Sequence, residues 1–110
     1  MDIKELKCLI EKWNQNEHIY DWENFSETMW AMGFKMDCHE SYVELFDDKL
    51  GGDKEERQAV IKNLKTADKQ IVGNFIFSHW RYLTHWSYGF DVKKEREYFK
   101  ELFEVLLCKS

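Results

Sequence analysis

The chain has 110 residues, which is enough for one domain built around a single core, since domains run at roughly 100 to 200 residues. Its hydrophobic fraction of 44% and aromatic fraction of 16% exclude a disordered chain, because disordered segments are poor in aromatic residues. Twenty-one acidic against sixteen basic residues give a net charge of -5, which argues against a general affinity for nucleic acid or an anionic membrane. We therefore expect a globular protein whose residues 1–110 form one domain.

The first element in chain order is a helix over residues 2–14 with one apolar stripe. Its apolar side chains fall within about 120° of arc at 100° per residue. They are Ile3, Leu6, Leu9, Ile10 and Trp13. Cys8 lies opposite this stripe, so the pattern predicts an exposed thiol there.

A second helix follows a break in the pattern. Asp21 can cap its start, and we expect it to end near Asp37. The apolar positions that share one face are Trp22, Phe25, Met29, Met32 and Met36. A short third helix is predicted over 41–50, where Gly51 and Gly52 supply the left-handed residue that commonly ends a helix.

Three longer helices complete the chain. Asp53 with Glu56 forms a variant capping box before a helix that reaches Lys65. Thr66 or Asp68 caps a fifth helix that runs to about Ser87, and Asp91 caps a sixth that runs to the C-terminus. With no sustained period-two alternation, the sequence predicts an all-α, single-domain bundle of five or six helices.

The fifth helix is predicted to be the central one, over residues 70–87. In a chain that is one third charged, residues 70–90 carry a single formal charge, Arg81. Apolar side chains fill about half of the helix circumference, which is more than a surface helix needs.

The remaining side of that helix carries a polar stripe, which is the candidate ligand site. Its members lie three or four residues apart, so they share one face. They are Asn74, Ser78, Arg81 and His85, with Tyr82 beside them. Either the stripe pairs with polar groups inside the fold, or Arg81 binds a carboxylate or phosphate while His85 and Tyr82 complete a pocket.

The candidate partner surface combines aromatic and acidic residues of the second and third helices. Trp30 and Phe34 lie off the main apolar stripe, and the nearby acids are Glu23, Glu27, Glu40, Glu44, Asp47 and Asp48. Aromatic anchors ringed by charge are typical of protein interfaces, and a negative field steers a surface toward a basic partner. The alternative is two buried aromatics and a solvated acidic face.

The sequence predicts no catalytic residues, no metal site and no cofactor. No nucleophile stands in a recognisable triad context, and Cys38 with His39 is the single adjacent Cys and His pair, without a C-x-x-C motif. Cys8, Cys38 and Cys108 are an odd number at wide spacing, which predicts free thiols. With neither a secretory signal pattern nor a membrane-spanning run, we expect a reduced, cytoplasmic protein.

These patterns favour a small acidic interaction protein that binds and regulates or inhibits a larger basic protein, in the manner of an inhibitor or immunity factor. The alternative is a small-molecule-binding domain or enzyme with a pocket for an anionic ligand, lined by the helix over 74–86.

Overall fold

The computed structural model describes residues 2–12, 22–35, 54–86 and 91–109, with side chains for all of these except 22–24, 82 and 84–86. Within them lie five helices and no strand: α1 (Ile3–Glu11), α2 (Trp22–Ala31), α4 (Lys54–Thr66), α5 (Lys69–Trp86) and α6 (Val92–Cys108). The all-α fold class is confirmed. The helix expected over 41–50 lies outside the described residues, so the total of five or six helices stays a prediction.

Three of the helices begin at an aspartate that caps them. The Asp2 side chain accepts a hydrogen bond from the Glu5 backbone N–H at 2.9 Å, as Asp91 does from Lys94 at 3.2 Å. Asp68 accepts from the Ile71 N–H at 3.0 Å. Each cap satisfies one of the four N–H groups that a helix start leaves unbonded, which stabilises the helix by about 1 kcal/mol. The predicted caps Asp68 and Asp91 are confirmed.

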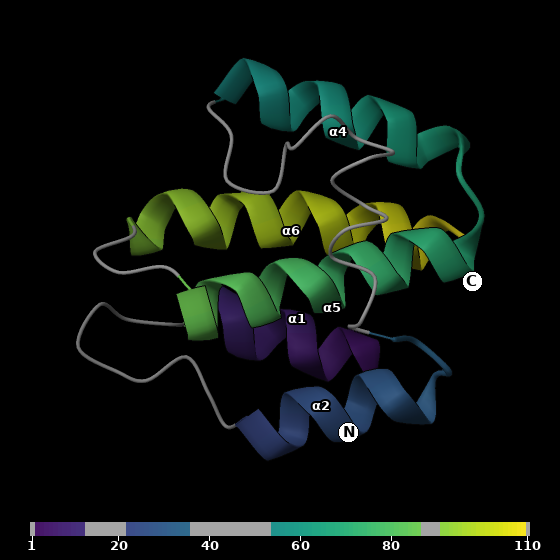
Figure 1. Ribbon diagram of the computed structural model, residues 1–110, viewed down its shortest axis with the longest axis vertical. Helices are drawn as coiled ribbons and strands as arrows, with labels where there is room; N and C mark the ends of the chain where they lie inside the picture. Colours follow the sequence, from purple (N-terminus) through teal and green to yellow (C-terminus); the bar gives the residue numbers. More distant parts are fainter. Residues whose placement is uncertain (1, 13–21, 36–53, 87–90, 110) are drawn as a thin grey trace.

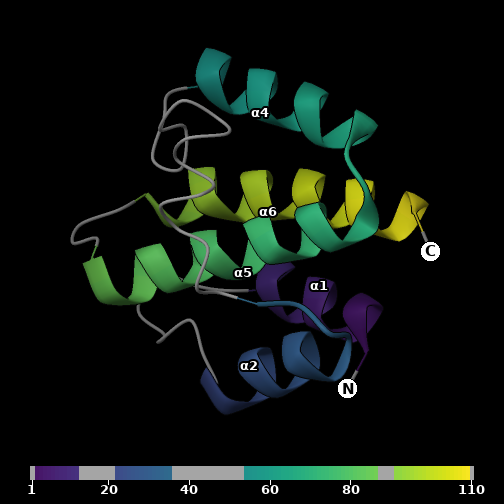
Figure 2. The ribbon, with the colours of Figure 1, turned by 45° about the vertical axis from the view of Figure 1, so that its right-hand side comes forward.

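The helices stack in layers, with α4 at one end, α5 and α6 in the middle, and α1 and α2 at the other end (Figure 1). Among the described helices, α6 packs against α1, α5 and α4, while α2 packs against α1 and α5. The helices α4 and α6 run in the same direction, so both begin on the same side of the molecule (Figure 2). None of the described helices combines the length and apolar character that crossing a bilayer requires.

One hydrophobic core joins all five helices. Its largest fully buried side chains come from α5 and α6: Trp80, Phe75, Phe77, Phe99 and Phe103. Phe25 of α2 stacks on Trp80 with the ring centroids 4.2 Å apart and the planes nearly parallel. Burying an aromatic or aliphatic side chain contributes about 1.5 to 3 kcal/mol, so these rings dominate the stability of the fold.

The middle of helix α5 is buried, because every residue from 72 to 80 is buried. This agrees with the near absence of charge in its sequence. That α5 is the central helix stays a prediction, because α6 also lies in the middle layer and the structure does not describe several α5 side chains.

Two apolar residues expected in buried stripes are instead exposed. Leu9 is 48% exposed, because it lies at the edge of the apolar arc of α1, whereas Ile3, Leu6 and Ile10 are buried. Met32 is 41% exposed, because α2 ends at Ala31 and the helical register no longer applies beyond it.

Candidate functional site

A buried ionic network joins α4, α5 and α6. The Glu95 carboxylate of α6 accepts a hydrogen bond from Arg57 Nη2 of α4, and its other oxygen lies 2.8 Å from His79 Nε2 of α5. The Arg57 guanidinium also lies over the Tyr98 ring, 4.3 Å from its centroid. All four side chains are buried. One carboxylate therefore ties three helices together.

The electrostatics of Glu95 follow from its surroundings. Burial alone would raise the pKa of Glu95, but the hydrogen bonds and charges of His79 and Arg57 outweigh that effect and leave the pKa below its ordinary value. Glu95 therefore stays ionised at neutral pH. Burial also raises the pKa of the Tyr98 hydroxyl, which therefore remains a hydrogen-bond donor.

The network arises because charged residues occupy positions in apolar stripes. Arg57 shares the inward face of α4 with Val60, Ile61 and Leu64, three to seven residues further on. A lone buried charge is costly, so each of these groups requires a partner. The charge pattern of the sequence does not predict this site, because Glu95 stands in the charged run 93–97, which is typical of a solvated surface. The helical register of Glu95 with Val92, Phe99 and Leu102 is the signal that could have revealed it.

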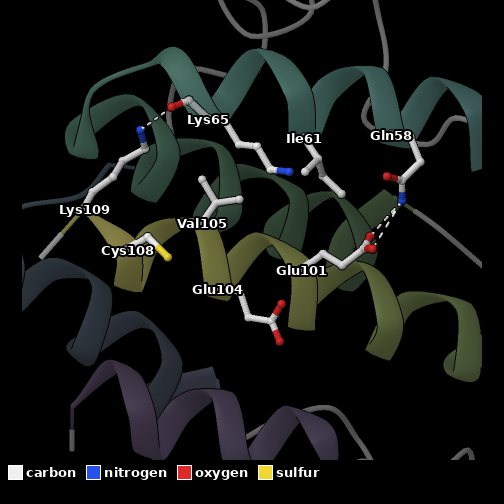
Figure 3. A pocket seen from close by; sticks show the side chains of 8 residues that line it. All are labelled: Gln58, Ile61, Lys65, Glu101, Glu104, Val105, Cys108 and Lys109. Atoms are coloured by element: carbon white, nitrogen blue, oxygen red, sulfur yellow. Dashed lines mark hydrogen bonds between the residues drawn. The ribbon is translucent and has the colours of Figure 1, made fainter.

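Between α4 and α6 the surface is hollowed in two adjoining places, which together we call the α4–α6 groove. The first hollow, of about 520 Å³, has Ile61 of α4 and Val105 of α6 pointing into the space between the helices (Figure 3). At one end of it Lys109 Nζ donates to the Lys65 carbonyl, and at the other Gln58 Nε2 donates to Glu101.

The second hollow, of about 700 Å³, lies toward the start of both helices, and we call it the Tyr98 hollow because Tyr98 and Arg57 line it. It thus adjoins the buried network. The Tyr98 hydroxyl is buried and has no hydrogen-bond partner among the described residues. The size of this hollow is within the roughly 300 to 1,000 Å³ that small-molecule sites occupy.

The predicted ligand stripe on α5 is largely buried where it is described. The Asn74 side-chain oxygen accepts hydrogen bonds from the Lys35 backbone N–H at 2.7 Å and from Gln70 Nε2 at 2.9 Å. Ser78 is buried and Arg81 is half-buried. Because Asn74 is buried and its oxygen holds the Lys35 backbone and the Gln70 side chain, the geometry gives Asn74 a structural role.

The Asn74 contacts belong to a clamp that holds the chain just after α2. Gln70 Nε2 also donates to the Gly33 carbonyl at 2.8 Å, and Gly33 adopts a left-handed conformation with φ of 84°. This conformation favours glycine, which has no Cβ to clash. Immediately after it, the Phe34 ring packs onto Gly73 so closely that a Cβ there would clash with the ring.

The clamp separates the two aromatic residues predicted for the partner surface, because it leaves one exposed and buries the other. Trp30 is 54% exposed, as expected of a surface anchor, and Glu27 is exposed one turn earlier. Phe34, expected beside Trp30, is instead a core residue that is 3% exposed. The reason is that α2 ends at Ala31 rather than near Asp37, so Phe34 turns inward instead of continuing the helical face.

The other residues predicted for the two sites fall outside what the structure describes. For the ligand site these are the side chains of Tyr82 and His85. For the partner surface they are the side chain of Glu23 and the residues Glu40, Glu44, Asp47 and Asp48.

The donor groups in the described part of the chain form no cluster of three or more His, Cys, Asp or Glu suited to a metal ion. Comparison of the chain with protein-family models, with curated proteins and with solved structures found no match.

Proposed function

We propose that this chain is an interaction protein that binds and regulates a larger, basic protein through the surface of α2 around Trp30. The observation that carries the proposal is the indole of Trp30, which is more than half exposed. Its ring meets the buried Phe77 edge to face, with the centroids 6.0 Å apart. Tryptophan is the residue type most enriched among the energetic centres of protein interfaces, so a supported and exposed indole is well suited to anchor a partner.

The clamp after α2 supports this role because it fixes the position of the anchor. Gln70 and Asn74 hold the backbone of Gly33 and Lys35, and Phe34 inserts against α5. A contact group that is already held in place loses little conformational entropy when a partner binds, which increases affinity.

Charge supports a basic partner. The chain carries a net charge of -5, and Glu27 lies three residues before Trp30, on the same side of α2. An arginine or lysine of a partner can lie over the indole face and pair with this carboxylate, because tryptophan gives the strongest cation–π contact. A reducing, cytoplasmic setting is part of the proposal, and the exposed free thiols Cys8 and Cys108 are consistent with it.

The test is capture of partners from the native host with the wild-type chain and two variants. Trp30→Ala removes the proposed anchor, and Leu9→Ala is the matched control, since Leu9 is a comparably exposed apolar residue on another helix. We expect a basic protein that wild type and Leu9→Ala capture, that Trp30→Ala loses, and that salt releases.

If wild type, Trp30→Ala and Leu9→Ala all capture the same proteins, the Trp30 surface is not the binding site. Purified Trp30→Ala should remain folded, since it removes an exposed group and one edge-to-face contact that contributes about 0.5 to 1.5 kcal/mol.

A further inference from the structure

We propose that the partner presents an arginine, rather than a lysine, to the α2 surface, with its guanidinium stacked on the Trp30 indole and paired with Glu27. This inference deepens the proposed function and rests on it. Four observations support it: the charge of the sequence around α2, the position of Glu27 relative to the indole, the unpaired state of that carboxylate, and the charge at the end of the helix.

The segment that contains α2 is acidic. Residues 13–34 include four carboxylates and no lysine or arginine, in a chain that has sixteen basic residues. The four are Glu17, Asp21, Glu23 and Glu27. Helix α2 lies at one end of the helix stack, so one of its sides faces away from the other described helices (Figure 1). A surface of one charge sign attracts the opposite sign on a partner, which here is a cation.

The Glu27 carboxylate and the Trp30 indole share one side of α2. They are three residues apart, and long side chains in a helix lean toward its N-terminus, which directs the indole toward the turn that carries Glu27. Both side chains are exposed, and the edge-to-face contact with the buried Phe77 supports the indole. A single cation can therefore contact the ring and the carboxylate together.

The described basic side chains leave Glu27 available. The nearest lysine along the chain is Lys35, whose backbone N–H is held by Asn74 of α5. Arg81 of α5 lies one turn beyond Phe77 and is half-buried. Among the described residues, neither of these cations forms an ion pair with Glu27. Its negative charge is therefore not neutralised by a direct contact within the described chain.

The C-terminal end of α2 adds to the negative potential. The last turn of the helix contains no basic residue, and residues 30–33 are exposed and uncharged. The end of a helix carries a partial negative charge, which a nearby cation offsets. The ring face, the carboxylate and the helix end therefore all favour a positive group at the same place.

This combination suits arginine better than lysine. The guanidinium is planar, so it can stack on the indole while its N–H groups, which lie in the same plane, donate to a carboxylate. It is also more weakly hydrated than an ammonium group, so it loses less hydration when the partner covers it. The lysine ammonium is a compact, strongly hydrated charge without a flat face to stack.

The first test is a selection of random dodecapeptides, displayed on phage, for binding to the full chain. Peptides that also bind Trp30→Ala are removed. Among the remaining peptides we expect arginine to be enriched over lysine by at least about threefold relative to the starting library. The inference is overturned if lysine is enriched as strongly as arginine, or if every selected peptide also binds Trp30→Ala.

Matched peptides and variants then test the contact in solution by fluorescence anisotropy. A selected peptide is prepared with arginine, lysine or citrulline at the enriched position. Lysine should weaken binding by about threefold or more, and so should citrulline, which keeps the planar shape of arginine but not its charge. A lysine or citrulline peptide that binds as tightly as the arginine peptide contradicts the assignment.

Two variants of the chain test the role of Glu27. Glu27→Gln should weaken binding of the arginine peptide by about two- to fivefold, the range expected for an exposed ion pair. The control Glu55→Gln removes an exposed carboxylate of α4 and changes the net charge equally, so it should leave the affinity unchanged. Equal affinities for wild type and Glu27→Gln, or equal losses in the two variants, would show that Glu27 does not pair with the arginine.

The outcome distinguishes this inference from the proposed function. If Trp30→Ala loses the captured partner while the peptides prefer lysine or bind Glu27→Gln unchanged, the Trp30 surface is the binding site and the arginine assignment is wrong. If Trp30→Ala captures the same proteins as wild type, the proposed function itself is wrong.

Discussion

Replacing Glu95 by Gln tests the buried network most directly. The substitution keeps the size of the side chain but removes the charge that faces both Arg57 and His79. The Glu95 and Arg57 side chains are 4% and 7% exposed, so solvent cannot replace the lost interaction. Breaking a buried pair by removing one partner costs about 3 to 5 kcal/mol, because it leaves a buried charge uncompensated. We expect Glu95→Gln to lose stability in that range.

The assay is urea denaturation followed by far-ultraviolet circular dichroism, with Glu101→Gln as the control. Glu101 also accepts hydrogen bonds from an α4 side chain, Gln58, but at an exposed position, so its loss should cost less than about 1.5 kcal/mol. A second variant combines Arg57→Met with Glu95→Leu, and should be more stable than Glu95→Gln because no unpaired guanidinium remains. A fall in Glu95→Gln no larger than in Glu101→Gln would refute the reasoning.

The same carboxylate predicts a dependence of stability on pH. The folded-state pKa of Glu95 is lowered below 4.5, so its contribution is fully present above the unfolded-state pKa and is lost as the pH falls through the folded-state value. Wild type should therefore lose stability on acidification below about pH 4.5, and Glu95→Gln should lose less over the same interval. If the free energy of unfolding falls equally with pH in the two proteins, groups other than Glu95 cause the acid sensitivity.

Three further predictions concern the clamp and the core. Gly73→Ala should destabilise the protein by about 1 to 3 kcal/mol in urea denaturation, because its Cβ would meet the Phe34 ring; equal stability would mean that the ring moves aside freely. Phe34→Ala should cost about 3 to 5 kcal/mol in the same assay, well above the cost of Trp30→Ala, and similar losses would contradict the contrast between a core and a surface ring. Amides of residues 72–80 should exchange hydrogen more slowly than those of 3–11, and equal rates would argue against a central position for α5.

The helical fold could be predicted because its signals are local. Aspartates before Ile71 and Lys94, the apolar stripe of α6 and the absence of proline are all readable without knowledge of the tertiary structure. The end of α2 was harder to predict. Apolar residues continue at helical spacing as far as Met36, whereas the chain leaves the helix at Ala31 and turns at Gly33. The position of a helix end is decided by what the following residues pack against, here Phe34 on Gly73.

The buried network could not be predicted in the same way, because its members lie far apart in the chain. Arg57 and Glu95 are 38 residues apart, and each is surrounded by other charged residues in the sequence. Only their register with apolar neighbours distinguishes them from surface charges. Arg81 is an isolated charge in the sequence of α5, yet the buried ionic network among the described residues joins Arg57 and His79 to Glu95.

The shared carboxylate of Glu95 also constrains how this sequence can diverge. A descendant chain that replaces Glu95 by an apolar residue retains a guanidinium from Arg57 and an imidazole from His79 inside the same core. Replacing Glu95 alone, or Arg57 alone, leaves a buried charge without its partner and is strongly destabilising. Only a coordinated exchange of these residues restores a stable interior. Positions 57, 79 and 95 should therefore covary among homologues, and such a triplet of linked columns would identify distant relatives of this fold whose surfaces have changed beyond recognition.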